Sequence, residues 1–189
     1  MNKKQIVKYI LSITIIATVL VGLSGINLTT NTVTSSVSGI SYNSAVCKVV
    51  TRADGKVEDL GCSHNLFSNQ GKNITRDLIG SYTGLAAVTV IGLGNTSGAT
   101  TAGTNLGGLI SDCDLQAQVG TYSLTDSSVG NWTIQKQFTS GCSGLVVNST
   151  ALYNATAAGT GNYFAANNFT STTLQANDQI TITWYIWVT

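Results

Sequence analysis

The clearest pattern in the chain is an alternation of apolar and polar positions from Gln179 to Val188. The even-numbered positions of this run are apolar, and they are Ile180, Ile182, Trp184, Ile186 and Val188. A period of two with many β-branched and aromatic residues is typical of a β-strand whose two faces differ. We therefore expect a strand here that is built into a sheet.

Further strands are predicted along the whole chain. Residues 131–139 alternate in the same way, with Trp132, Ile134 and Phe138 on one face. The more continuous apolar run of residues 85–91 suits a strand that is covered on both faces. Shorter candidates are residues 115–122, 145–148 and 163–169. Gly- and Ser-rich turns separate these runs, and this pattern predicts an all-β sandwich or barrel-like antiparallel domain.

One short helix is also expected. Ser68 can cap a helix that runs from Asn69 to Leu78 and stops at Gly80. Ile74 and Leu78 stand four residues apart and would share one face of this helix. Residues 94–108, which are rich in Gly, Thr, Asn and Ala, read as a loop in which only Leu106 is a large apolar residue.

The first 25 residues have the features of an export signal. Lys3, Lys4 and Lys8 precede an apolar stretch over residues 9–23, and two small residues close it. This order is typical of a secretory signal peptide and predicts an extracellular or cell-surface location. A pilin-type leader that is cut near Lys4 and keeps the apolar helix is the alternative, because the stretch is just long enough to be an anchor.

Residues 26–46 form an uncharged segment rich in Thr, Ser and Asn. The apolar residues Val33, Val37, Ile40 and Tyr42 are spaced among these polar residues. One interpretation is a flexible linker. The other is an extended donor strand that has no partner in its own domain and adds to the sheet of a neighbouring molecule. Either way, residues 47–189 are expected to form the β-sandwich head.

Charge and composition limit the classes of partner. The chain carries nine basic and eight acidic residues, and removal of residues 1–25 takes away three lysines and leaves 6 − 8 = −2. We expect no nucleic-acid binding, because no basic patch is present. The chain has no proline and few lysines, the residues that often protect sheet edges from further pairing. This scarcity of proline and lysine has two explanations. It reflects either a bias in composition or sheet edges that pair with strands of other subunits.

Four cysteines in an expected exported chain indicate two disulfides. Three pairings are possible, and we favour Cys47–Cys62 with Cys113–Cys142. The first bond would bracket a hairpin that turns at residues 53–55, where Asp and Gly favour a turn. Free buried thiols are the alternative. A zinc site is not expected, because the cysteine spacing does not suit it and His64 is the one histidine.

Seven sequons make N-glycosylation a further expectation for an exported protein. The acceptor residues are Asn27, Asn73, Asn95, Asn131, Asn148, Asn154 and Asn168. The alternative is that these sequons reflect only a polar surface rich in Asn and Thr.

Residues that could carry catalysis are few. His64 lies beside a cysteine that we expect to be oxidised, and a lone histidine is a weak base candidate. Asp112 and Asp114 flank Cys113 and could be a carboxylate pair, although a solvated turn is the simpler interpretation. Residues 92–94 lack the third glycine of a dinucleotide loop. Trp184, Tyr185 and Trp187 could bind sugar, with core packing the favoured use of Trp184. We therefore expect neither an enzyme nor a cofactor or metal site.

Several stretches resemble a β-rich domain of virus tail-associated proteins and exported archaeal proteins. They are residues 64–80, 88–94, 130–139, 147–154 and 169–184. Their sequences are, in this order, HNLFSNQGKNITRDLIG, VTVIGLG, GNWTIQKQFT, VNSTALYN and FTSTTLQANDQITITW. This resemblance implies a structural β domain and no catalytic residues.

The layout of leader, uncharged tail and disulfide-bearing, sequon-rich head is similar to subunits of archaeal threads. This second resemblance implies a filament built by donor-strand complementation, with residues 31–46 as the donor and a head-to-tail homopolymer as the assembly. The alternatives are a viral or cell-surface adhesion module and a pilin-like subunit. Expected partners are other copies of the chain, N-linked glycans and cell surfaces or other filaments.

Overall fold

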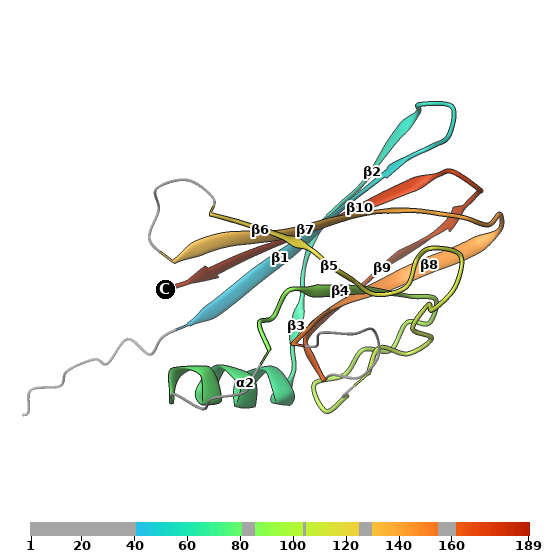
Figure 1. Ribbon diagram of the computed structural model, residues 1–189. Coiled ribbons are helices and arrows are strands. Elements are labelled where there is room, and N and C mark those ends of the chain that lie inside the picture. The colour runs from blue at the N-terminus through green and yellow to red at the C-terminus, as the bar shows by residue number, and fades with distance from the viewer. Residues whose placement is uncertain (1–40, 81–85, 104, 125–129, 155–161) are drawn as a thin grey trace, which may run out of the picture. The chain divides into compact units, whose positions relative to one another are not determined.

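A computed structural model describes residues 41–80, 86–103, 105–124, 130–154 and 162–189, all within the second unit of the chain, Ile40–Thr189. This unit consists of two five-stranded antiparallel sheets that face each other, with a short helix beside them (Figure 1). The prediction of an all-β sandwich with one short helix is confirmed. Residues 1–25, expected to be a signal peptide, lie outside the described residues.

The first sheet, sheet A, has the long C-terminal strand at its centre. Its order is β2 (Val57–His64), β1 (Tyr42–Thr51), β10 (Gln179–Val188), β7 (Asn131–Thr139) and β6 (Thr121–Leu124). β10 pairs with both β1 and β7 over almost its whole length. The predicted alternation is observed, because the even positions from Ile180 to Ile186 are buried while Tyr185 on the other face is exposed.

The second sheet, sheet B, is joined to sheet A at both edges. Its order is β3 (Leu66–Phe67), β9 (Tyr163–Leu174), β8 (Leu145–Tyr153), β4 (Val90–Gly94) and β5 (Gln118–Val119). The chain passes from β2 into β3 at Asn65 and from β5 into β6 at Gly120. Strands that switch sheets in this way form the corners of a sandwich.

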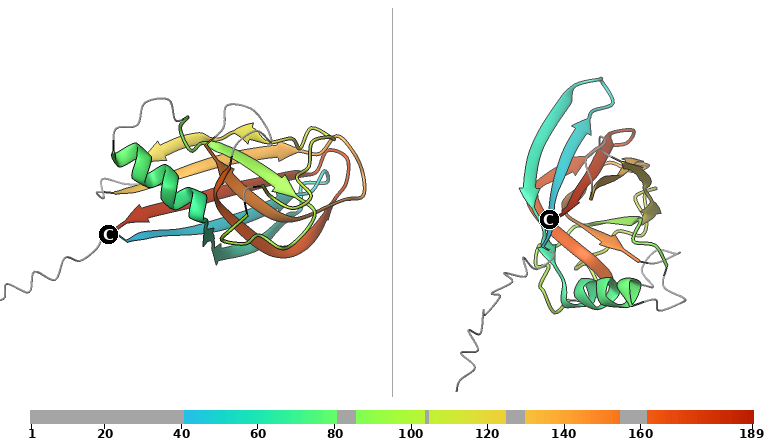
Figure 2. Two further views of the ribbon diagram at one scale, coloured as in Figure 1. Left: turned by 90° about the horizontal axis from the view of Figure 1, so that it is seen from below. Right: turned by 90° about the vertical axis from the view of Figure 1, so that its left-hand side faces the viewer.

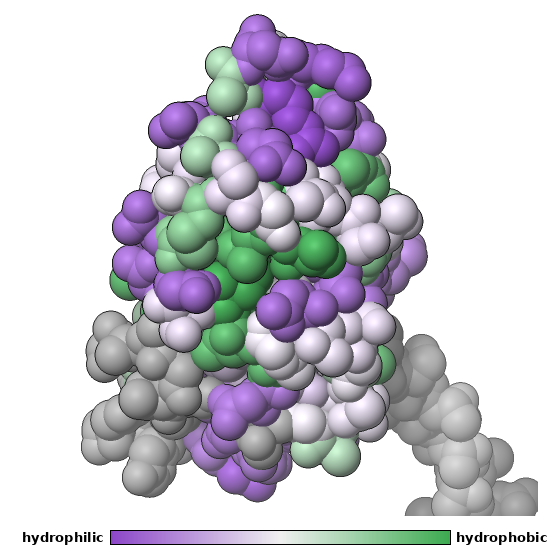
Figure 3. All heavy atoms as spheres, turned by 90° about the vertical axis from the view of Figure 1, so that its right-hand side faces the viewer, coloured by the Kyte–Doolittle hydropathy of each residue, from purple (hydrophilic) through white to green (hydrophobic). Residues whose placement is uncertain are grey.

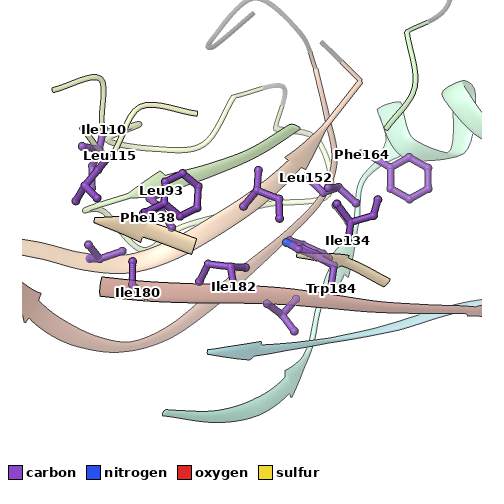
Figure 4. Packing of buried hydrophobic residues seen from close by; sticks show 14 of the residues in the cluster. Leu93, Ile110, Leu115, Ile134, Phe138, Leu152, Phe164, Ile180, Ile182 and Trp184 are labelled. Carbon is purple, nitrogen blue, oxygen red and sulfur yellow. The ribbon is translucent and has the colours of Figure 1, made fainter. Parts of the chain in front are cut away.

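The main core lies between the two sheets. Figure 4 shows Ile134, Phe138, Ile182 and Trp184 of sheet A beside Leu93 and Leu152 of sheet B. Trp184 is fully buried, so its expected use in the core is confirmed.

A smaller apolar cluster covers the outer face of sheet B. The loop between β4 and β5 contributes Leu106 and Ala117, which pack with Tyr153 and Tyr163 of the sheet. Gly94 allows the loop to pack closely on the sheet, because a Cβ at this position would lie 2.5 Å from Ser149 Oγ and 2.8 Å from the side chain of Leu106. β4 is therefore buried on both faces, as expected for the apolar run of residues 85–91 that overlaps its first two positions.

The helix α2 (Asn69–Ile79) has the predicted ends. Ser68 Oγ accepts a hydrogen bond from the Gly71 backbone N–H at 2.8 Å, and Gly80 follows the last turn. Gly71 and Ile74 are the buried residues of the helix, and α2 packs against β9. Figure 2 shows α2 lying across the strands at one end of the sandwich.

Both favoured disulfides are present. Cys47–Cys62 joins the facing strands β1 and β2, and Cys113–Cys142 ties the loop before β5 to the turn between β7 and β8. The predicted turn at residues 53–55 is observed between β1 and β2, with Gly55 at a φ of 88°. Figure 3 shows this turn as a hydrophilic tip above an apolar area in the middle of that face. Two disulfides are typical of a protein that works in an oxidising, extracellular setting.

Several predicted boundaries are wrong. β8 and β9 run to Tyr153 and Leu174, beyond the ends of the candidates over residues 145–148 and 163–169. β4 begins at Val90, because residues 86–89 form an irregular segment in which the Thr89 N–H donates to the Ala87 carbonyl. The candidate over residues 115–122 is divided between β5 and β6, because the chain changes sheets at Gly120. The head begins at Tyr42 and not at residue 47, because β1 starts there and pairs with β10.

In the part of the chain that the structure describes, no helix has the length and apolar character needed to cross a membrane.

Candidate functional site

An apolar groove of about 540 Å³ lies at the end of the sandwich where β1 begins and β10 ends. The described part of its lining consists of aliphatic and aromatic side chains and two threonines, with no charged residue among them. The described lining residues are Tyr42, Thr75, Leu78, Ile79, Ala87, Val88, Thr89, Tyr122, Trp132, Ile134, Phe164, Ile186 and Val188. Figure 2, right, looks onto this end, with α2 on one side and the strands of sheet A on the other.

One wall of the groove is the inner face of sheet A near its end. Ile186 of β10 lies opposite Trp132 of β7, and Ile134 of β7 lies opposite Tyr122 of β6. These residues sit at alternate positions of their strands, so their side chains share one face. The period-two pattern that predicted β7 and β10 therefore accounts for Trp132, Ile134 and Ile186 lying on the same face.

The other wall consists of the last turn of α2 and residues 87–89. Leu78 and Ile79 are 49% and 71% exposed, which is unusual for adjacent large apolar residues. Val88 packs against the edge of the main core. On this wall, Leu78 and Ile79 are thus apolar side chains that remain accessible to solvent in the single chain.

Three aromatic rings hold the start of β1 in place beside the groove. Tyr42 stacks on Phe67 with ring centroids 4.4 Å apart and meets Phe164 edge-on at 5.2 Å. Phe67 and Phe164 are 5.0 Å apart. Burial raises the pKa of Tyr42 to about 12, so the side chain stays neutral over the physiological range.

The structure describes only one of the four residues that we expected in the donor strand. Val33, Val37 and Ile40 lie outside the described residues. Tyr42 was placed in the donor strand, but it belongs to β1, where it pairs with Val188 of the same chain and lines the groove. The residues from Tyr42 onward are therefore excluded from a donor segment. The sequence prediction failed because polar Ser44 and Lys48 occupy inward positions of β1 and obscure its alternation.

Lys48 is a buried residue that sequence reasoning missed. The side chain points inward between Val46 and Val50, and its Nζ donates to Ser63 Oγ at 2.8 Å. Ser63 Oγ also lies within hydrogen-bond distance of the Asn167 amide of β9. Burial lowers the pKa of Lys48. This polar cluster of Lys48, Ser63 and Asn167 joins sheet A to sheet B. The sequence signal that could have revealed it is the position of Lys48 between Val46 and Val50 on the apolar face of β1.

The weaker catalytic candidates do not come together. His64 is exposed at the end of β2. Asp112 and Asp114 are exposed in the turn that holds Cys113, where Cys113 and Asp114 have φ angles of 55° and 60°. Within the described ranges, no group of three or more His, Cys, Asp or Glu side chains could hold a metal ion.

The sequon asparagines differ in exposure. Asn73, Asn95 and Asn168 are exposed. Asn131, Asn148 and Asn154 are half-buried, and Asn27 lies outside the described residues. Glycosylation remains a prediction, with the three exposed sites the best placed for a bulky glycan.

No protein-family model, curated protein or solved structure matches this chain. Inferences about function therefore depend on the geometry and chemistry of the groove. An uncharged groove with aromatic and aliphatic walls suits an apolar occupant, and an extended peptide with alternating apolar side chains is one such occupant.

Proposed function

We propose that this protein is the structural subunit of an extracellular filament, in which the N-terminal tail of one copy binds in the apolar groove of the next. The observation that supports this proposal most directly is the groove itself. No charged residue is found among the described residues that line it, and the tail of residues 26–40 contains none either. An uncharged, partly apolar segment can enter such a groove without the cost of desolvating a charge.

The point of attachment also supports the proposal. The tail joins the head at Ser41, next to Tyr42 in the groove wall, and Ser41 exchanges hydrogen bonds with Thr189. Fifteen residues, 26–40, span about 50 Å when extended. Each Val or Ile of the tail that becomes fully buried would stabilise the contact by about 1.5–3 kcal/mol.

A contact between the tail of one copy and the groove of another joins two different surfaces. Such a heterologous contact grows into an open filament when its geometry does not close into a ring. The two disulfides give each head covalent links that persist in an oxidising setting.

Deletion of residues 26–40 tests the proposal. The deletion must stop there, because Tyr42 and the residues after it belong to sheet A. We expect the exported full-length protein to form filaments visible by electron microscopy, and the deletion variant to sediment as a folded monomer.

A charge on one face of the tail gives a finer test. Val33→Lys with Val37→Lys places two charges on one face of an extended segment, and we expect assembly to be lost. Thr34→Lys with Ser36→Lys is the matched control, because the same charges then lie on the other face. A full-length protein that stays monomeric, and instead binds a glycan or a small apolar ligand, would contradict the proposal.

A further inference from the structure

The two edge strands of sheet A differ in how they are protected against further pairing. β2 carries Glu58 and Asp59, and its register with β1 shifts between Cys47 and Val49. Gly61 of β2 adopts a φ of 76°. Charged side chains and bulges are the usual devices that prevent a sheet edge from accepting another strand.

β6 at the opposite edge has none of these devices. Its four residues, Thr121–Leu124, are uncharged and exposed, and they pair with β7 in an unbroken register. Tyr122 and Leu124 are 54% and 73% exposed, and Tyr122 lines the groove. Among the described strands, β6 pairs only with β7. An uncharged edge of regular register with apolar side chains on one face is a site at which a further strand can add.

We propose that residues 32–38 of a second copy add as a strand to the edge of β6. This inference rests on the proposed function and specifies where the tail binds. Val33 and Val37 share one face of an extended segment and would lie over the groove beside Tyr122 and Leu124. Thr34 and Ser36 would then face outward, in line with Thr121 and Ser123 of β6.

The distances across sheet A favour the tail of a second copy over the chain's own tail. A strand added outside β6 lies four strand spacings from β1, because β10, β7 and β6 come between. Four spacings amount to about 19 Å. The four residue steps from Ser38 to Tyr42 span at most about 14 Å. Ser38 of the same chain therefore falls short of the edge of β6, so the chain's own residues 32–38 cannot add there over their whole length.

A lysine at the edge of β6 tests the inference. Leu124→Lys introduces a charge at an exposed position, so the fold should persist, while strand addition and assembly should be lost. Val57→Lys is the matched control, because Val57 is 61% exposed at the start of β2 in the other edge strand. We expect Val57→Lys to assemble as the parent does, with both variants keeping the parent melting temperature to within a few degrees.

Cysteine cross-linking identifies which copy supplies the strand. One full-length variant carries Val33→Cys and a second carries Leu124→Cys, and the two are mixed under mild oxidation. We expect a disulfide-linked dimer in the mixture that neither variant gives alone at the same yield. A double variant that forms the bond within a single copy would overturn the assignment to a second copy.

The outcomes separate this inference from the proposed function. If the Val33 and Val37 lysines abolish assembly but Leu124→Lys does not, the tail drives assembly through another surface and the inference about β6 is wrong. If neither set of lysines affects assembly, both the inference and the proposed function are wrong.

Discussion

Single residues decide how closely the layers of this protein approach one another. A Cβ on Gly71 would lie 2.2 Å from the Phe164 carbonyl oxygen and 2.6 Å from the ring of Phe67. α2 can therefore rest on β9 only because this position has no side chain. Since Phe67 and Phe164 also hold Tyr42, the same contact supports one side of the groove.

Gly71→Ala should destabilise the protein by about 1–3 kcal/mol, because the added methyl group forces α2 away from β9. Lys72→Ala is the control, since Lys72 is exposed on the same helix and a change there should stay within about 0.5 kcal/mol. Urea unfolding followed by circular dichroism measures both. Equal stability of the two variants would show that the approach of α2 to β9 is not limited by this residue.

Asp178 should make the stability of the fold depend on pH. Its carboxylate accepts hydrogen bonds from the Gln175 and Ala53 N–H groups and from Arg52, and these contacts lower its pKa. The pKa of an aspartate in an unfolded chain is near 4, and the pKa of Asp178 in the folded protein is lower. The carboxylate therefore stabilises the fold when the pH is above about 4, and this stabilisation is lost as the pH falls through the folded-state pKa.

Asp178→Asn should therefore give a shallower fall in stability between about pH 5 and pH 2 than the parent shows. The melting temperature recorded across this range measures the difference. Parallel curves for the two proteins would contradict the role assigned to this carboxylate.

At the scale of secondary-structure elements, local patterns predicted β10, β7, α2 and the hairpin of β1 and β2. Each depends on a short run of residues, such as the alternation from Gln179 to Val188 or the cap at Ser68. The start of β1 was not predicted, because Lys48 and Ser44 lie buried where apolar residues would mark the strand. The burial of these polar groups depends on partners such as Ser63, Asn65 and Asn167 that are distant in sequence.

The two disulfides should protect different elements. Replacing Cys113 and Cys142 by serine should loosen the loop between β4 and β5 and raise amide exchange there, at a cost of about 3 kcal/mol in stability. Replacing Cys47 and Cys62 by serine is the matched comparison and should affect the hairpin of β1 and β2 instead. Hydrogen–deuterium exchange by mass spectrometry locates each change, and identical exchange maps would contradict this division.

At the scale of the whole molecule, the groove could not be predicted from the sequence. Its lining comes from α2, residues 87–89 and five strands, and only the fold brings these segments together. The sequence did show the other half of the proposed contact, which is an uncharged tail in which Val33 and Val37 are four residues apart and would share one face of an extended segment. The fold adds a candidate acceptor beside an unprotected edge, β6, and moves the end of the tail from Val46 to before Tyr42.

A reconstruction of the assembled protein by electron cryomicroscopy tests the account most directly. It should show residues 32–38 of one copy as a strand beside β6 of the next, with Val33 and Val37 against Tyr122 and Leu124. A reconstruction in which the tail lies on its own head, or in which the groove takes no part in the contact between copies, would contradict the account.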